Sequence, residues 1–276
     1  MKKLLSIKTL ALFLCVTLSF GISIGAIGAI EVSATGTPDA PKNIIFMIGD
    51  GMGPNQVGMA HDHIGRDLYM ETMPYRGTSE TSNSSGQVTD SAAGATALAC
   101  GIKTRNERIG MTASTSTDPI PVPNIREYFA DMGKKTGLVS TVSITDATPA
   151  AFGAHNISRA NQTQIAAEYI EREIDIIMGG GGSNFSTELR NTAINDKGYS
   201  LITTKNQLLS FDGSSKLLAL FYDGNLPYYS ADYPETVPTL EEMTANSIDI
   251  LNQNEEGFFL MVEGGLIDGA GHANLI

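Results

Sequence analysis

The segment 88–97, Val-Thr-Asp-Ser-Ala followed by a run of small residues, carries the most chemical information in this chain. A serine that opens a helix lies among backbone N–H groups without intrahelical partners, at the positive end of the helix dipole. Such a position favours an anionic substrate, and the Ser91 hydroxyl is placed to attack it. The alternative interpretation is that Asp90 only caps a buried helix of small residues.

Two carboxylates and an imidazole lie close together in sequence near the end of the chain, at Glu263, Asp268 and His272. Asp268 and His272 are four residues apart, so one helical turn would place both on the same face, and an oxygen with a nitrogen ligand suits zinc. Glu263 follows an apolar run and would suit a harder ion such as magnesium. A surface loop with unrelated charges is the alternative, which the apolar run leading into Glu263 makes weaker.

Two further segments supply carboxylate, hydroxyl and guanidinium groups. Asp50 follows the apolar run 43–48 among glycines, whose small size lets a carboxylate approach a cation, although Asp-Gly is also a common turn pair. Thr148 offers a hydroxyl ligand shortly after Asp146. Arg159 lies one short predicted helix further on, and a guanidinium binds two phosphate oxygens at once and stays charged at any working pH.

Alternating strand and helix patterns must position these residues. Amphipathic or capped segments predict helices at 124–132, 162–173 and 239–251, and apolar runs predict strands at 43–48, 136–142, 174–178, 217–222 and 258–262. This alternation predicts an α/β fold with a mainly parallel central sheet and helices on both faces. Because ligands bind beyond the carboxyl ends of parallel strands, Asp50, Asp146 and Glu263 are expected to meet at one rim.

The first 34 residues differ from the rest. A basic start is followed by an almost wholly apolar stretch over 10–30 and by small residues at 32–34, which together predict a secretory signal peptide. An uncleaved membrane anchor is the alternative, since the apolar stretch is nearly long enough to span a bilayer. Residues 35–41 are predicted to be a linker and 42–276 the catalytic domain. Either interpretation places that domain outside the cytoplasm.

Composition limits the classes of partner. The chain has 42% hydrophobic and 17% charged residues, as globular proteins do, and a formal net charge of −12, which becomes −14 without residues 1–34 because they hold three lysines and Glu31. With no basic stripe, a nucleic-acid partner is excluded, and membrane contact is expected only through an uncleaved N-terminus. The negative charge gives no attraction for an anionic substrate, so its site would need local positive charge, such as bound metal ions.

The remaining histidine and glycine motifs are not predicted to be functional. His61 and His63 are two apart, so on a helix they would point away from each other, which favours a solvated face. His155 favours packing or a local hydrogen bond. The glycines at 179–182 lack the ending of a nucleotide-binding loop and predict a close-packed turn. Cys100 is the single cysteine outside the signal segment, so an intramolecular disulfide is excluded and a small buried apolar role is expected.

Four motifs in order along the chain resemble those of bacterial alkaline phosphatase, over roughly residues 40–276. Each motif alone is modest, and four in register are specific. They are Gly49-Asp50-Gly51-Met52-Gly53, Thr89-Asp90-Ser91-Ala92-Ala93, Asp146-Ala147-Thr148-Pro149-Ala150-Ala151 with Arg159, and Glu263-Gly264-x-x-Ile267-Asp268-x-x-x-His272. The resemblance implies metal-dependent hydrolysis of small phosphate monoesters through a phosphoserine at Ser91. It also implies that Arg159 clamps the phosphoryl oxygens and that Asp90 orients Arg159.

The same resemblance implies one Mg²⁺ and two Zn²⁺ sites. Magnesium would be held by Asp50, Thr148 and Glu263. One zinc would be held by Asp50 and Ser91, and the other by Asp268 and His272. Asp146 would act indirectly, through the water shell of the magnesium. Zinc, cobalt and manganese share such ligands, so the identity of the metal stays open. A homodimer is implied by the resemblance alone.

The resemblance also reveals a difference. The family carries an Asp-His pair and a further histidine closer to the C-terminus, which complete both zinc sites, whereas this chain stops at Ile276. Two protein ligands are fewer than zinc usually has. We therefore expect an N-terminal fragment of a longer enzyme, with weak or no turnover by itself. A phosphodiesterase or sulfatase of the same superfamily, or a secreted non-catalytic domain that binds phosphate or metal, are the alternatives.

Overall fold

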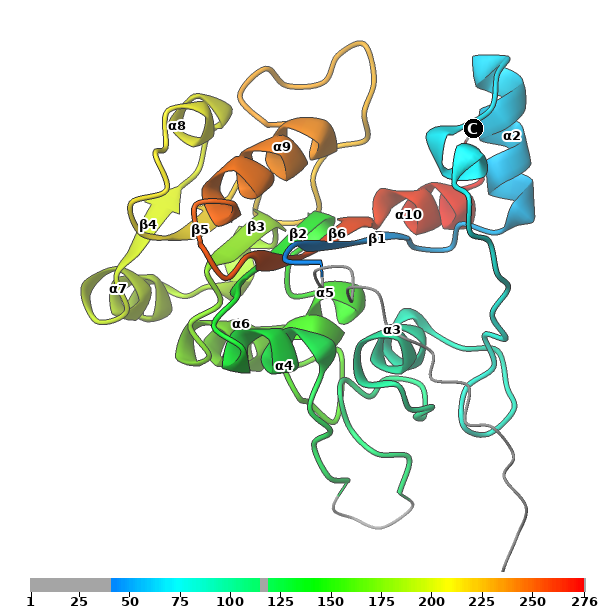
Figure 1. Cartoon of the computed structure of the whole chain (residues 1–276), viewed down its shortest axis with the longest axis horizontal. Helices are drawn as coiled ribbons and strands as arrows, with labels where there is room; N and C mark the ends of the chain where they lie inside the picture. The colour runs from blue at the N-terminus through cyan, green and yellow to red at the C-terminus, as the bar shows by residue number, and fades with distance from the viewer. Residues whose placement is uncertain (1–40, 115–118, 276) are drawn as a thin grey trace, which may run out of the picture. The chain divides into compact units, whose positions relative to one another are not determined.

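The computed structural model describes residues 41–114 and 119–275. Figure 1 shows the chain as a central sheet with helices on both faces. The predicted signal peptide over 1–34, and all of the predicted linker except Pro41, lie outside the described residues. Within the described part of the chain, no helix combines the length and the hydropathy that crossing a bilayer requires.

Six strands form one sheet in the order β1-β6-β2-β3-β5-β4, and every neighbouring pair is parallel. The predicted α/β fold with a parallel sheet is confirmed. The strand β4 is short and lies at the edge, and its polar Ser200 breaks the apolar pattern by which the others were predicted. The strands are β1 Ile44–Gly49, β2 Lys135–Ser143, β3 Ile176–Gly180, β4 Tyr199–Ile202, β5 Lys216–Leu220 and β6 Phe258–Gly264.

Helices cover both faces of this sheet (Figure 1). One apolar cluster packs residues from α3, α4, α5, α6 and α7 against the sheet, and a second packs α8 and α9 against the other face. The helices are α2 Pro54–Ile64, α3 Ser91–Cys100, α4 Ile125–Asp131, α5 Ala147–Gly153, α6 Gln162–Glu171, α7 Thr187–Asn195, α8 Lys205–Leu209, α9 Leu240–Leu251 and α10 Leu266–Ala273, with 3₁₀ turns at η1 Tyr69–Thr72 and η2 Gly182–Asn184.

The apolar runs arise because central strands are buried on both sides. In β6, Phe259 and Met261 belong to one cluster, whereas Phe258, Leu260 and Val262 belong to the other. Side chains alternate between faces along a strand, so a strand covered on both sides must be apolar throughout. Full burial of each such side chain contributes about 1.5–3 kcal/mol, which fixes the position of β6 between β1 and β2.

The strand β6 extends further than predicted, and this affects the site. Glu263 lies within the strand, paired in register with Ser140 of β2 and Ile48 of β1. The apolar pattern ends at Val262, but the backbone ladder continues, because Glu263 pairs with both neighbouring strands and Gly264 pairs with Gly49 of β1. The strand register therefore sets the neighbours of Glu263.

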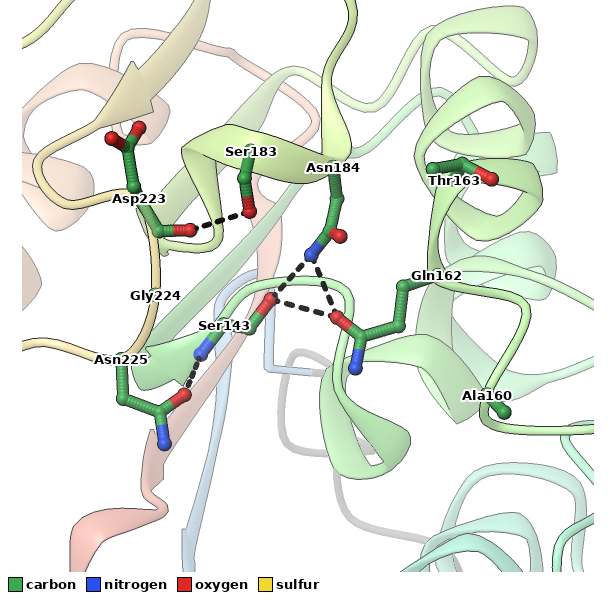
Figure 2. Close-up of a pocket in the computed structure, with 9 residues that line it drawn as sticks. All are labelled: Ser143, Ala160, Gln162, Thr163, Ser183, Asn184, Asp223, Gly224 and Asn225. Carbon is green, nitrogen blue, oxygen red and sulfur yellow. Dashed lines mark hydrogen bonds between the residues drawn. The ribbon is translucent and has the colours of Figure 1, made fainter.

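A network of neutral polar side chains fixes the carboxyl end of β2, just before Asp146 (Figure 2). The Asn184 side-chain amide donates to Ser143 Oγ at 3.0 Å and to Gln162 Oε1 at 2.7 Å. The backbone N–H of Ser143 donates to Asn225 Oδ1 at 2.8 Å. These residues line a cavity of about 420 Å³ that contains none of the predicted site residues. The predicted turn at 179–182 is wrong for its first two residues, because Gly179 and Gly180 end β3 and the chain turns only from Gly181. Its close packing is confirmed, since Gly180 lies too close to the Gly224 carbonyl for a side chain.

Candidate active site

The predicted site residues gather at the carboxyl edge of three neighbouring strands. Asp50 follows β1, Glu263 lies near the end of β6 and Asp146 follows β2. A cavity of about 930 Å³ opens at this edge. The predicted residues that line it are Asp50, Asp90, Ser91, Thr148, Arg159, Asp268 and His272. Glu263 and Asp146 do not line the cavity and contact its residues from behind.

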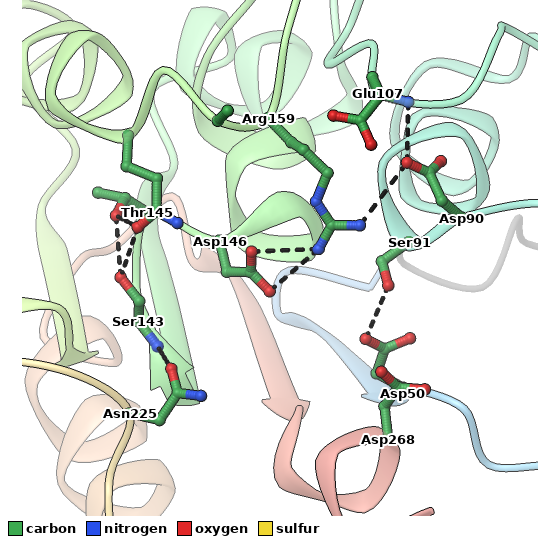
Figure 3. Close-up of polar contacts among 12 residues, drawn as sticks. Asp50, Asp90, Ser91, Glu107, Ser143, Thr145, Asp146, Arg159, Asn225 and Asp268 are labelled. Carbon is green, nitrogen blue, oxygen red and sulfur yellow. Dashed lines mark hydrogen bonds and ion pairs between the residues drawn. The ribbon is translucent and has the colours of Figure 1, made fainter. Parts of the chain in front are cut away.

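Ser91 is the first residue of α3, as its sequence pattern predicts. The Asp90 side chain caps this helix, because its Oδ1 accepts a hydrogen bond from the backbone N–H of Ala93 at 2.9 Å. The Ser91 hydroxyl donates to Asp50 Oδ2 at 2.9 Å (Figure 3). Asp90 therefore caps the helix while Ser91 lies beside the Asp50 carboxylate. The capping interpretation and the nucleophile interpretation are compatible.

Two carboxylates hold the guanidinium of Arg159 (Figure 3). One nitrogen lies 3.2 Å from Asp146 Oδ1, and another lies 3.6 Å from Asp90 Oδ2. Burial opposes the charge of Arg159, but the ion pairs with Asp146 and Asp90 outweigh it and raise the pKa of the guanidinium. The contact with Asp90 has the geometry that the resemblance implied. The contact with Asp146 was missed, because a separation of thirteen positions matches no helical or strand spacing.

Glu263 is the most deeply buried acid of the site, with 1% of its surface exposed. The Ser140 hydroxyl donates to Glu263 Oε2 at 2.5 Å, and the Thr148 side chain also hydrogen-bonds the carboxyl group. Burial raises the pKa of Glu263 to about 7, and the charges of Asp50 and Asp146 add to this effect. Ser140 was missed in the sequence, because it is one of several hydroxyl residues in β2 and nothing local distinguishes it from the others.

The donor atoms fit divalent cations. Burial also raises the pKa of Asp50, and the charges of Asp268 and Asp146 raise it further, although the Ser91 hydrogen bond opposes them. Carboxylates that raise one another's pKa are stabilised by a shared cation. The carboxylates of Asp50 and Glu263, together with the Thr148 hydroxyl, offer the oxygen ligands that magnesium prefers.

Asp268 and His272 lie one turn apart on α10, with His272 Nε2 3.4 Å from Asp268 Oδ2. This is the shared helix face that their spacing predicts, and it offers a nitrogen and an oxygen ligand as zinc requires. Gly51 makes room for it. Its φ is +61°, and a Cβ there would lie 2.5 Å from Asp268 Oδ1, so both the backbone conformation and the space require glycine.

The histidines outside the site have local partners. His61 Nδ1 lies 3.0 Å from Glu71 Oε2, and with Asp67 these form a partly exposed group whose ligand atoms lie within 4.8 Å of one another. His63 is exposed on the same helix. His155 contacts the Gly110 carbonyl at 2.9 Å and Glu127 at 3.1 Å, so its predicted hydrogen-bonding role is confirmed.

Cys100 is less buried than predicted. It lies half-buried at the end of α3, and its Sγ is 3.4 Å from the Val122 carbonyl oxygen. Burial raises the pKa of this thiol to about 12, so it stays protonated and unreactive at neutral pH.

Comparisons with known proteins agree with this geometry. The alkaline phosphatase family model matches residues 41–276. Alkaline phosphatase 4 of Bacillus subtilis is 40% identical over 257 residues, which are 84% of this chain and 53% of that protein. A cold-active alkaline phosphatase from Shewanella sp. superposes with a TM-score of 0.73 at 39% identity, covering 84% of this chain and 58% of that one.

A second similar structure is a variant of the alkaline phosphatase from the Antarctic bacterium TAB5, with Mg bound in its M3 site. Its TM-score is 0.68 at 31% identity, covering 85% of this chain and 67% of that one. The chain thus spans about half the length of the Bacillus relative. The family model spans all the described residues. The chain belongs to the alkaline phosphatase family.

Proposed function

We propose that this chain carries the phosphoryl-transfer half of an enzyme that hydrolyses phosphate monoesters through a phosphoserine at Ser91. The observation that carries the proposal is the Ser91 hydroxyl, which lies at a helix N-terminus, 2.9 Å from Asp50, in the same cavity as Arg159. A nucleophile, a carboxylate and a guanidinium around one cavity are what transfer of a phosphoryl group needs.

Arg159 binds two oxygens of the phosphoryl group, and its ion pairs with Asp90 and Asp146 keep it in one orientation. The backbone N–H groups at the start of α3 favour the same anion. Ser91 Oγ then attacks phosphorus as the bond to the substrate alcohol breaks. Water subsequently attacks the phosphoserine, which releases phosphate and restores the hydroxyl.

The residues present fit the metal ions of the family. Asp50, Thr148 and Glu263 would hold magnesium, Asp50 with Ser91 would hold one zinc, and Asp268 with His272 would hold the other. When bound, such ions lower the pKa of serine and water and stabilise charge on the transferring oxygens. Asp146 would act on magnesium indirectly, and its ion pair with Arg159 gives it a second role. The proposal of a magnesium site is supported by the similar TAB5 variant, whose structure holds Mg in its M3 site.

A phosphate monoester is the substrate class favoured over a diester or a sulfate ester. A monoester carries an additional charged oxygen, and Arg159 supplies a charged fork for it within the Ser91 cavity. The natural alcohol portion is left open, because the site residues that we identify contact the phosphoryl group. A homodimer and delivery outside the cytoplasm, through residues 1–34, complete the proposal.

Covalent labelling tests this function. The purified chain is incubated with ³²P-phosphate, Zn²⁺ and Mg²⁺ at acid pH, and the adduct is located by mass spectrometry. We expect label on Ser91, and none in Ser91→Ala. A control variant, Ser247→Ala, removes a buried hydroxyl of α9 and should label normally. An unlabelled wild-type chain that still binds phosphate would instead support a non-catalytic binding domain.

A further inference from the structure

Glu107 has a backbone conformation that its residue type disfavours. It lies in the loop between α3 and α4 with φ of +73°, where it is one of three residues other than glycine with positive φ in residues 41–114 and 119–275. The turn around it is closed by the Arg108 N–H, which donates to the Arg105 carbonyl at 3.3 Å. The third position of such a turn ordinarily takes glycine or asparagine when φ is positive. A glutamate there costs free energy, so the surroundings must enforce it.

The backbone of Glu107 contacts Asp90, which caps the Ser91 helix, and Arg159, which would bind the phosphoryl anion. Its N–H donates to Asp90 Oδ2 at 2.8 Å, which is the same oxygen that Arg159 approaches at 3.6 Å. Its carbonyl accepts the backbone N–H of Arg159 at 2.8 Å. One peptide segment therefore joins the cap of the Ser91 helix to the backbone of the arginine. Figure 3 shows the first of these contacts, between the Glu107 N–H and Asp90.

The neighbours of Glu107 reinforce this connection. Asn106 Oδ1 accepts the backbone N–H of Asp90 at 3.2 Å, and its amide group donates to the Val88 carbonyl at 3.1 Å. Further along, Ile109 and Asn156 exchange two backbone hydrogen bonds of 2.9 Å. The Glu107 side chain, in contrast, is exposed. The hydrogen bonds that reach the site are thus made by the backbone, and the carboxylate acts on Arg159 through its charge, which contributes to the raised pKa of the guanidinium.

We propose that the left-handed backbone of Glu107, rather than its carboxylate, positions Asp90 and Arg159 for binding the phosphoryl group. This inference rests on the proposed function of Ser91 and Arg159. It makes Glu107 a positioning residue. Glycine or asparagine should replace it, since both adopt positive φ readily, whereas a β-branched residue should not.

Three variants separate the backbone from the side chain. Glu107→Gly and Glu107→Asn keep the backbone conformation and remove the carboxylate, whereas Glu107→Val opposes the conformation. Arg105→Val is the matched control, because it places the same β-branched side chain in the same turn without positive φ. Inorganic phosphate binding is measured by ³¹P NMR with Zn²⁺ and Mg²⁺. Amide hydrogen exchange at residues 107 and 159 is measured by ¹⁵N NMR without phosphate.

We expect Glu107→Val to weaken phosphate binding about tenfold, since displacement of a positioning group by about 1 Å has large effects. The amides of residues 107 and 159 should exchange faster in that variant. Its far-UV CD spectrum should equal that of the wild type, which shows that the variant is folded. Glu107→Gly, Glu107→Asn and Arg105→Val should resemble the wild type within about twofold. Wild-type exchange or affinity in Glu107→Val would overturn the inference. Losses in Glu107→Gly equal to those in Glu107→Val would also overturn it, because they would assign the role to the carboxylate.

The two measurements also distinguish this inference from the proposed function. A wild-type chain that binds no phosphate would count against the function of the site. The exchange rates at residues 107 and 159 would still decide whether Glu107 holds the two segments together. Should Glu107→Val not fold, the comparison of Glu107→Gly with the wild type decides, because only the backbone role predicts that a variant without the carboxylate binds phosphate and exchanges both amides as the wild type does.

Discussion

Glu263 has an unusual environment for an acid, since it is buried in the central strand β6 between Ser140 and Thr148. A buried carboxyl group must be neutralised, hydrogen-bonded or paired with a cation. Ser140 hydrogen-bonds only one of the two carboxylate oxygens of Glu263. The neighbouring acids Asp50 and Asp146 carry the same charge as Glu263 and cannot neutralise it. These surroundings explain why a cation is the partner that suits it.

Removal of the Ser140 hydroxyl should weaken binding of Mg²⁺. In Ser140→Ala the Glu263 carboxylate loses the donor that fixes its orientation, and loss of such an outer hydrogen bond typically costs tenfold to about a hundredfold in metal affinity. Isothermal titration with Mg²⁺ measures the effect. Ser247→Ala, which removes a buried serine hydroxyl bonded to the Met243 carbonyl, is the control. Equal Mg²⁺ affinity in both variants would contradict the assignment.

Replacement of Arg159 by lysine should lower kcat/KM about a hundredfold, although the charge is kept. A lysine ammonium cannot contact Asp90 and Asp146 and also present two donors to the phosphoryl group. Steady-state hydrolysis of an aryl phosphate, with Zn²⁺ and Mg²⁺, measures this. Arg190→Lys is the matched control, since Arg190 bonds only backbone carbonyls of Phe185 and Gly182 outside the site. Comparable rates for Arg159→Lys and wild type would argue against the clamp.

Among the elements, the N-terminus of α4 contacts other parts of the fold through the side chain of Glu127. Glu127 completes the capping box of this helix by accepting the Asn124 N–H at 2.9 Å, and it also contacts His155 and Arg172. Burial alone would raise the pKa of Glu127, but the bonds from His155 and Asn124 and the charge of Arg172 lower it to about 2.

This arrangement predicts a stability contribution that depends on pH. A depressed pKa in the folded state stabilises the protein above the ordinary pKa of 4.5, and that contribution disappears as the pH falls towards 2. We expect Glu127→Gln to remove about 1–2 kcal/mol of unfolding free energy at pH 7 and to flatten its decline between pH 5 and 2. Urea unfolding at several pH values measures this. Glu241→Gln, an exposed glutamate in the first turn of α9, should leave the profile unchanged.

The elements that the sequence predicts best are those with a local cause. The Thr239 capping box and the apolar run of β6 depend on neighbouring residues only, and both are found. Asp50, Asp146 and Glu263 could be placed at one rim because strand ends in a parallel sheet share an edge. The Asp146–Arg159 pair, Ser140 and Glu107 could not, because their roles depend on strand register and loop geometry that no spacing encodes. The half-buried state of Cys100 likewise depends on the loop at Val122.

At the scale of the whole molecule, β1 forms an edge of the described sheet and carries exposed apolar side chains. Met47 is 66% exposed and Ile45 is 43% exposed on this strand. An edge strand with apolar side chains offers unpaired backbone groups to another chain. The 276-residue chain is therefore expected to self-associate through this edge.

Met47→Lys should reduce that association, because a charge on an edge strand opposes pairing. Sedimentation velocity at increasing protein concentration measures it, and we expect the weight-average mass to stay near that of the monomer in the variant. The control is Met132→Lys, an exposed methionine that directly follows α4 and is not part of β1. If both variants associate as the wild type does, another surface is responsible.

The number of zinc ligands in the 276-residue chain should limit its rate of phosphate ester hydrolysis. In the proposed assignment, each zinc position would draw on two protein ligands among the described residues, which are Asp50 with Ser91 and Asp268 with His272. We expect the chain with Zn²⁺ and Mg²⁺ to hydrolyse aryl phosphate far more slowly than a full-length relative assayed beside it, because zinc sites usually have three or four protein ligands. Rates equal to those of the relative would refute this.

The strand order has a consequence for biosynthesis. The strand β1 is made first among the six, yet in the described sheet its ladder partner is β6, the last, with Ile44 opposite Phe259. More than two hundred residues must therefore leave the ribosome before β1 can be paired, and chains with such distant contacts fold slowly. Asp50 and Asp268 meet only at that moment. A nascent chain consequently carries no assembled phosphate site, and the chemistry waits until translation has passed α10.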